Sequence, residues 1–167
     1  VEMQSEAVDP TKIEGIKKGI PGTSGEKRAS LLSNKIGSIS KNTITGVYGT
    51  IDVVPKRKTL PIANQNEVKK GQAQILTVVN GSKVEMFDIE ILSINYQDSV
   101  GVKGITFKIT DKELLNATNG VIQGMSGSPI IQNKMIVGAV SHVSLEDPKI
   151  GYAMHIEWMY EESNNLI

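Results

Sequence analysis

The segment that decides the fold is Gly124-Met125-Ser126-Gly127-Ser128-Pro129, which leads into apolar runs at 128–131 and 135–143. The polar tripeptide at 132–134 separates the two runs, so the sequence predicts a strand, a tight turn and a second strand. Glycines on both sides of Ser126 permit a sharp turn that exposes its hydroxyl group. The N–H groups of Gly124 and Ser126 could then converge on one point, as donors to an oxyanion must. Ser126 is therefore a candidate nucleophile at the mouth of a β-hairpin.

The rest of the chain also has the pattern of a mainly β protein. Sixteen glycines and six prolines divide it into short segments, and those at 87–91 and 104–110 alternate apolar and polar residues as half-buried strands do. Asn80-Gly81 lies between two further candidate strands, 74–79 and 83–86, and predicts a hairpin with a tight turn. Residues 110–113 resemble a capping box at the start of a helix, and residues 156–164 could form a second helix.

Composition excludes several classes of function. Eighteen basic and eighteen acidic residues leave no net charge, and the basic residues are scattered, so the sequence gives no electrostatic footprint for nucleic acid. The absence of cysteine rules out disulfides, thiolate metal sites and a cysteine nucleophile. The two histidines are not grouped with carboxylates at ligand spacing, so we expect no metal and no organic cofactor.

A second serine signature does not fit. The G-x-S-x-G pattern of α/β-hydrolases requires a glycine at position 128 and a helix after the turn, whereas Ser128 and Pro129 precede an apolar strand here. Instead, 124–129 with Gly138-Ala139-Val140-Ser141-His142 resembles the G-D-S-G-G-P block and following hairpin of trypsin-like serine proteases. This resemblance implies a double β-barrel with one or two short helices, and a substrate-binding strand at Ser141, His142 and Val143.

The positions of the two histidines argue against a role as base. Counting residues from the turn at 133–134 places Ser141 opposite Ser126 and points His142 the other way, so His142 is interpreted as a wall of the substrate site. His155 lies in an apolar run and is interpreted as a packed or surface histidine.

A longer string, 120–133 with 138–143, Asp147-Pro148 and 151–159, resembles the SpoIVB peptidase family of endospore-forming bacteria. The resemblance continues more weakly back to Ile13. It implies a serine peptidase domain over 1–167 that lacks an N-terminal segment, and a membrane segment and a PDZ domain elsewhere in the full-length chain. It also implies cleavage of the peptidase itself and of a regulatory protein between mother cell and forespore, which leads to activation of a late sigma factor.

The same resemblance suggests the remaining members of a catalytic triad. The family's triad aspartate follows a threonine at a strand end shortly before the serine, and Asp111 matches it. Asp111 could equally serve the first turn of a helix. The family's histidine belongs to a Gly-His motif, which does not occur in these 167 residues, so we expect it before Val1 and expect this chain alone to be inactive. The alternative is a pseudo-protease that binds extended peptides along 141–143 by β-augmentation.

Overall fold

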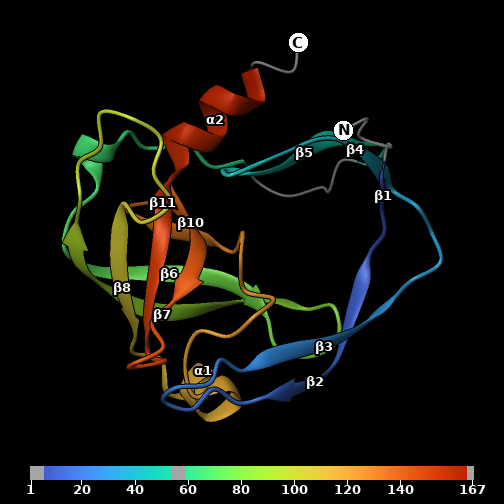
Figure 1. Cartoon of the computed structure of the whole chain (residues 1–167), viewed down its shortest axis with the longest axis horizontal. Helices are drawn as coiled ribbons and strands as arrows, with labels where there is room; N and C mark the ends of the chain where they lie inside the picture. The colour runs from blue at the N-terminus through green and yellow to red at the C-terminus, as the bar shows by residue number, and fades with distance from the viewer. Residues whose placement is uncertain (1–5, 54–58, 165–167) are drawn as a thin grey trace.

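Six strands in the second half of the chain close into a barrel (Figure 1). The computed structural model describes residues 6–53 and 59–164. Around the barrel the strand order is β10-β11-β8-β7-β6-β9, and every neighbouring pair is antiparallel. The strands are β6 (Gly71–Val78), β7 (Val84–Ile94), β8 (Ile105–Ile109), β9 (Pro129–Gln132), β10 (Met135–Val143) and β11 (Ile150–His155).

The interior of the barrel is built by the alternation that the sequence predicted. Ile75, Ile89, Phe107 and Ile109 are at most 1% exposed, and each such side chain contributes about 1.5–3 kcal/mol through burial. The residues between them face solvent or are partly exposed. The strands predicted at 87–91 and 104–110 are therefore confirmed as parts of β7 and β8.

Both predicted hairpins are present, with different turns. Asn133 and Lys134 join β9 to β10 with φ angles of 51° and 63°, the two positive values that a tight two-residue hairpin turn needs. The β6–β7 connection is longer than the tight turn predicted at Asn80-Gly81, since pairing stops at Val78 and Val84. Gly81 instead exchanges two backbone hydrogen bonds with Ile13, at 2.8 and 3.1 Å, and this pairing opens the turn.

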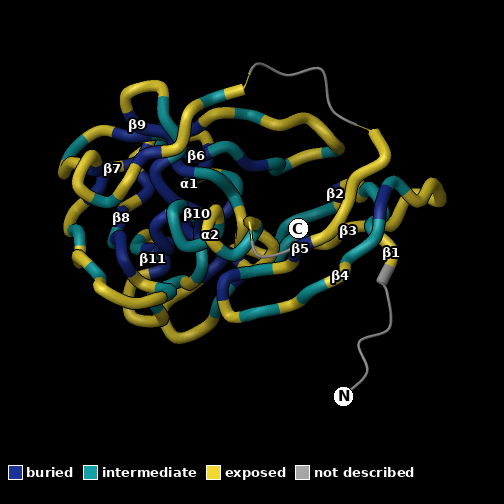
Figure 2. Tube along the Cα trace, turned by 90° about the horizontal axis from the view of Figure 1, so that it is seen from above, coloured by how far each residue is buried: buried dark blue, intermediate teal, exposed yellow. Residues whose placement is uncertain are grey.

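The first half of the chain forms two smaller sheets. β1 (Glu6–Val8), β4 (Gly37–Thr43) and β5 (Gly46–Ile51) form one sheet, and β2 (Thr11–Lys17) pairs with β3 (Glu26–Leu31) in the other. In the described residues, 6–53 and 59–164, these two sheets do not close into a barrel, whereas the strands of the second half of the chain do. They are also less buried than the barrel (Figure 2).

The β2–β3 hairpin is attached to the barrel beside the segment that carries Ser126. Lys27 donates its N–H to the Gln123 carbonyl and Gln123 donates to the Gly25 carbonyl, both at 2.9 Å. A parallel bridge between Glu26 and Gln123 results. Residues nearly a hundred positions apart are thereby held next to one another.

Two α-helices complete the fold, as expected. α1 (Lys112–Thr118) begins one residue later than the predicted capping box requires: Asp111, and not Thr110, is its N-cap. α2 (Ile156–Asn164) confirms the helix considered for 156–164, and a short 3-10 helix, η1 (Gln65–Glu67), was not predicted. Within the described ranges, the helices are too short or too polar to span a membrane, and no cluster of potential metal ligands is found.

Candidate active site

Ser126 lies on a loop, and the residues on either side of it are held by backbone hydrogen bonds. Met125 is fully buried and donates its N–H to the Ile122 carbonyl at 3.1 Å, while Gly127 donates to the Val140 carbonyl at 2.8 Å. Gly124 and Gly127 have φ angles of 91° and 81°, a region that glycine enters without steric cost. The result is an exposed Ser126 side chain between fixed residues.

The backbone of this loop leaves two donors free. In the described part of the chain, neither the N–H of Gly124 nor that of Ser126 has a hydrogen-bond partner, although the N–H of Met125 between them is used. Unpaired backbone donors are uncommon unless water or a ligand accepts their hydrogen bonds. The two N–H groups that we predicted as oxyanion donors are therefore available to bind an oxyanion. That role stays a prediction.

A pocket of about 330 Å³ lies beside Ser126. Its walls include the three residues predicted to bind substrate, Ser141, His142 and Val143, together with apolar side chains such as Val121 and Leu145. The structure therefore brings the predicted nucleophile and the predicted substrate strand to one cavity. His142 is exposed on its wall.

The predicted substrate strand has an open edge. On the β9 side, β10 pairs as far as Ala139, opposite Pro129, and Val140 exchanges backbone hydrogen bonds with Gly127 and Ser128. On the other side, His142 and Val143 pair with β11. The Ser141 hydroxyl donates to the main chain, with the carbonyls of Val102 and of Tyr152 (3.1 Å) as acceptors. Among the described residues, the edge of 141–143 beyond Val140 is therefore unpaired and accessible to an extended peptide.

Asp111 is placed as a structural residue. Its Oδ1 accepts the N–H of Leu114 at 2.9 Å, as an N-cap does, and its Oδ2 accepts the N–H of Asp88 at 3.4 Å. Over the described residues, no hydrogen bond joins Asp111 to Ser126 and Asp111 lines neither pocket next to the Ser126 loop. The geometry accounts for Asp111 as a helix cap, and its role as a triad member stays a prediction.

His155 is a packed histidine, as expected. It is 1% exposed, and its Nε2 lies 2.9 Å from the carbonyl oxygen of Asn95, to which it donates. Neither His155 nor His142 makes a hydrogen bond with Ser126 among the described residues.

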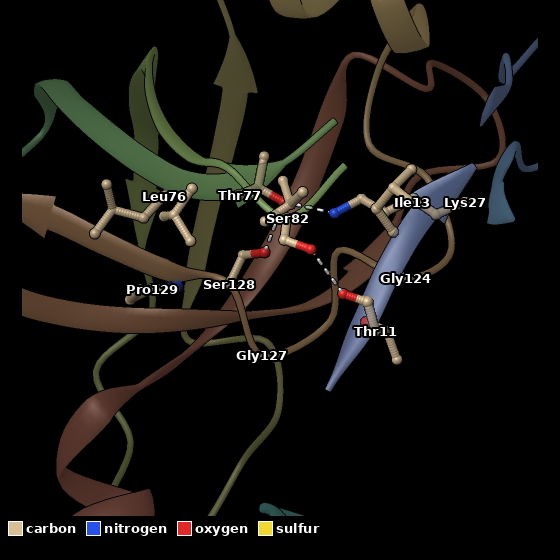
Figure 3. Close-up of a pocket in the computed structure, with 12 residues that line it drawn as sticks. Thr11, Ile13, Lys27, Leu76, Thr77, Ser82, Gly124, Gly127, Ser128 and Pro129 are labelled. Atoms are coloured by element: carbon tan, nitrogen blue, oxygen red, sulfur yellow. Dashed lines mark hydrogen bonds between the residues drawn. The ribbon is translucent and has the colours of Figure 1, made fainter. Parts of the chain in front are cut away.

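The structure also reveals a polar cluster that sequence reasoning missed. Lys27 Nζ donates to Thr77 Oγ1 at 2.7 Å, and Ser128 Oγ donates to the same oxygen at 3.2 Å (Figure 3). Burial lowers the pKa of Lys27 from its ordinary 10.5 to about 8. The three residues come from β3, β6 and the Ser126 loop, some fifty positions apart, and no motif connects them in the sequence.

The fold is that of the trypsin-like proteases. The crystal structure of the active form of the Rv3671c protease from M. tuberculosis superposes with a TM-score of 0.54 over 90% of this chain and 77% of that chain, at 13% identity. The predicted mainly β, trypsin-like fold with one or two short helices is confirmed; of the two barrels expected, the described residues form one closed six-stranded barrel and, in the first half, two open sheets.

The family follows from the sequence itself. The profile of the SpoIVB peptidase S55 family matches residues 1–160, so the chain belongs to this family and is a peptidase. The resemblance described above is confirmed. No curated protein sequence matches the chain.

Proposed function

We propose that this chain carries the nucleophile of a serine endopeptidase and that the nucleophile is Ser126. One observation carries the proposal: an exposed serine lies on a loop whose Gly124 and Ser126 N–H groups have no partner among the described residues, beside a pocket and a strand edge that is unpaired there. Membership of a peptidase family supports peptide-bond hydrolysis as the reaction of this arrangement.

The geometry supports acyl transfer. A substrate would pair with the free edge of 141–143, and Ser126 Oγ would attack the scissile carbonyl carbon. The N–H groups of Gly124 and Ser126 would hold the developing oxyanion, a contribution of about 3–4 kcal/mol per donor in related chemistry. A base takes the hydroxyl proton and returns it to the leaving amine; water then releases the acyl group by the reverse sequence.

The base we propose is the histidine of a Gly-His motif outside these 167 residues, in the full-length protein. The His155 ring is buried and its Nε2 donates to the Asn95 carbonyl, which supports an external base. Asp111 is the proposed orienter of that histidine by family resemblance, although both of its oxygens already accept backbone hydrogen bonds.

The biological role is proposed from family membership. The peptidase would cleave itself and a regulatory protein in the space between mother cell and forespore during endospore formation, and so trigger late sigma-factor activation. A PDZ domain and a membrane segment in the full-length chain would hold it there.

The second candidate is a pseudo-protease that binds peptides without cutting them. The free edge at 141–143 supports it equally, because β-augmentation needs main-chain groups and no base. The two functions differ in whether Ser126 is chemically activated.

A fluorophosphonate probe applied to the full-length protein tests the proposal. The expected result is covalent labelling that Ser126→Ala abolishes and Ser128→Ala retains. Labelling that survives Ser126→Ala would refute the nucleophile, and an intact, folded protein that is never labelled would favour the binding module.

A further inference from the structure

A second pocket, of about 400 Å³, lies against the Ser126 loop. Lys27 is the one charged residue among its described lining residues, and Thr77, Ser82 and Ser128 are its hydroxyl-bearing neighbours along with Thr11. Neutral and apolar groups form the other walls, so the cavity has a positive character set by one amine (Figure 3).

Lys27 has no carboxylate partner among the described residues. The neighbouring charges are engaged elsewhere: Arg28 with Glu26, Lys12 with Glu14, and Lys83 with Glu85, at 2.8–3.6 Å. Its hydrogen bond goes to the neutral Thr77. A partly buried ammonium group without a counter-charge is costly, and an incoming anion would relieve that cost.

Thr77 is a second donor toward the same space. Its Oγ1 accepts hydrogen bonds from both Lys27 and Ser128, and within the described residues its own proton has no acceptor. Thr77 is 4% exposed, so its hydroxyl is held in a fixed position in the wall of the pocket. Lys27 and Thr77 together offer a carboxylate one charged and one neutral hydrogen-bond donor, and the bond from the charged donor is the stronger kind.

The position of the pocket relative to Ser126 indicates what it binds. Gly124, Gly127 and Ser128 line this pocket, whereas Gln123 and Ser126 line the pocket that also contains His142. The nucleophile loop therefore separates the two cavities. If a peptide pairs with 141–143 before its scissile bond, as the proposed function requires, the part after that bond would lie on the side of the loop where Gly124 and Lys27 line the second pocket.

We propose that the pocket lined by Lys27 and Thr77 is the binding site for a carboxylate on the leaving-group side of the cleaved bond, provided by an acidic side chain or by a free C-terminus. The inference rests on the proposed function, because it takes the direction of the substrate from it. Lys27 acts here as a specificity residue and takes no part in bond breaking.

The preference should depend on pH. The Lys27 amine is charged below pH 8 and loses its charge as the pH rises above it, so selectivity for the acidic substrate is expected to decline over that range. The other charged groups on β2 and β3 are Lys12, Glu14, Lys17, Glu26 and Arg28, and Lys83 and Glu85 lie at the start of β7. Lys12 pairs with Glu14, Arg28 with Glu26, and Lys83 with Glu85, whereas no ion pair is found for Lys17 among the described residues.

A peptide library cleaved by the full-length protein provides the first test. At pH 6.5 we expect Asp and Glu to be enriched about tenfold over Asn and Gln after the cut, as one charge-assisted hydrogen bond gives. Lys27→Met should remove the enrichment and Lys27→Arg should keep it. Arg28→Gln, on the next residue of β3, is the matched control and should change nothing.

A binding measurement tests the pocket independently of cleavage. Lysine side-chain NMR on Ser126→Ala full-length protein would follow Lys27 Nζ during addition of amidated Ac-Ala-Glu-Ala-Ala, its Gln counterpart, and the Gln peptide with a free C-terminus. A rise in the Lys27 pKa with the Glu peptide alone identifies a side-chain carboxylate, and a rise with the free C-terminus identifies a terminal one.

The outcomes separate this inference from the proposed function. Labelling of Ser126 together with equal cleavage of Glu and Gln peptides, and an unshifted Lys27, would overturn the carboxylate site and leave the peptidase intact. A Lys27 shift in a folded protein that no probe labels would show that the pocket binds a carboxylate, but it would refute the enzyme and with it the assignment to a leaving-group side.

Discussion

The conformation of Gly124 sets the direction of one of the two proposed oxyanion donors. Its φ is 91°, and a Cβ there would lie 3.1 Å from Cβ of Lys27. A side chain would therefore meet both backbone strain and a crowded neighbour, and the N–H that we assign to the oxyanion would turn away.

Gly124→Ala is expected to lower the rate of fluorophosphonate labelling about 100-fold and the free energy of unfolding by about 1–2 kcal/mol. Gly22→Ala is the matched control, because Gly22 also has a positive φ, 81°, but open space around it. It should lose about 1 kcal/mol of stability and label normally. Equal labelling of both variants would contradict the assignment of the Gly124 donor.

Lys27 makes stability depend on pH. The folded protein releases this proton near pH 8, whereas the unfolded chain holds it to about 10.5. Between these values the unfolded state binds more protons, so the free energy of unfolding rises with pH. Below pH 8 the cost of burying the charge is fully present.

Lys27→Met should remove this rise, which we expect to be about 1 kcal/mol because solvent screens a partly exposed amine. Urea unfolding at pH 7.5 and pH 10 would measure it, with the exposed Lys149→Met as control. A wild-type rise that persists unchanged in Lys27→Met would show that the group responsible lies elsewhere.

At the scale of elements, α1 and its cap decide what Asp111 does. An N-cap asparagine replaces aspartate at little cost, whereas alanine costs about 1 kcal/mol. A triad aspartate behaves differently, since its amide analogue selects the wrong histidine tautomer and lowers the rate by about 10⁴.

Asp111→Asn and Asp111→Ala therefore separate the two roles when labelling and thermal unfolding are measured together in the full-length protein. From the hydrogen bonds to Leu114 and Asp88 we expect Asp111→Asn to be nearly as stable as the wild type. A loss of labelling of about 10⁴ in this stable variant would establish Asp111 as the orienter; unchanged labelling would leave it a cap.

The β9–β10 turn carries strain that a substitution can remove. Lys134 has a φ of 63°, where glycine is preferred. Lys134→Gly is expected to raise the free energy of unfolding by about 0.5–1 kcal/mol, as measured by urea denaturation, without a change in labelling. Lys134→Ala keeps the unfavourable φ and should give no gain.

The elements show what local patterns could and could not predict. The strands around Ile89 and Phe107 follow from alternation, because each needs only one buried face. The turn at Asn80-Gly81 was predicted too tight, since its geometry depends on Ile13, far away in the sequence. The helix start was displaced by one residue because Asp111, and not Thr110, accepts the Leu114 N–H.

At the scale of the whole molecule, the closed barrel and the open sheets differ in burial. The barrel holds most of the fully buried side chains, whereas Val47 and Ile51 of the β1-β4-β5 sheet are more than half exposed. In hydrogen exchange we expect amides of β6–β8 to exchange only through global unfolding, and those of β4 and β5 to exchange through local opening. Equal protection in both would contradict this division.

The candidate site lies where the barrel meets the β2–β3 hairpin. For this reason the sequence predicted the residues that come from one segment of the chain and missed those that come from different segments. Ser126 and the strand at 141–143 belong to one contiguous motif. Lys27 and Thr77 meet Ser128 only because the β2–β3 hairpin attaches at Gln123, and no local pattern encodes that attachment.

The structure of the fluorophosphonate adduct of the full-length protein tests the central claim most directly. The account predicts phosphorus bonded to Ser126 Oγ, with the phosphonyl oxygen about 2.7–3.1 Å from the N–H nitrogens of both Gly124 and Ser126. An adduct on another residue, or a phosphonyl oxygen directed away from these two donors, would contradict it.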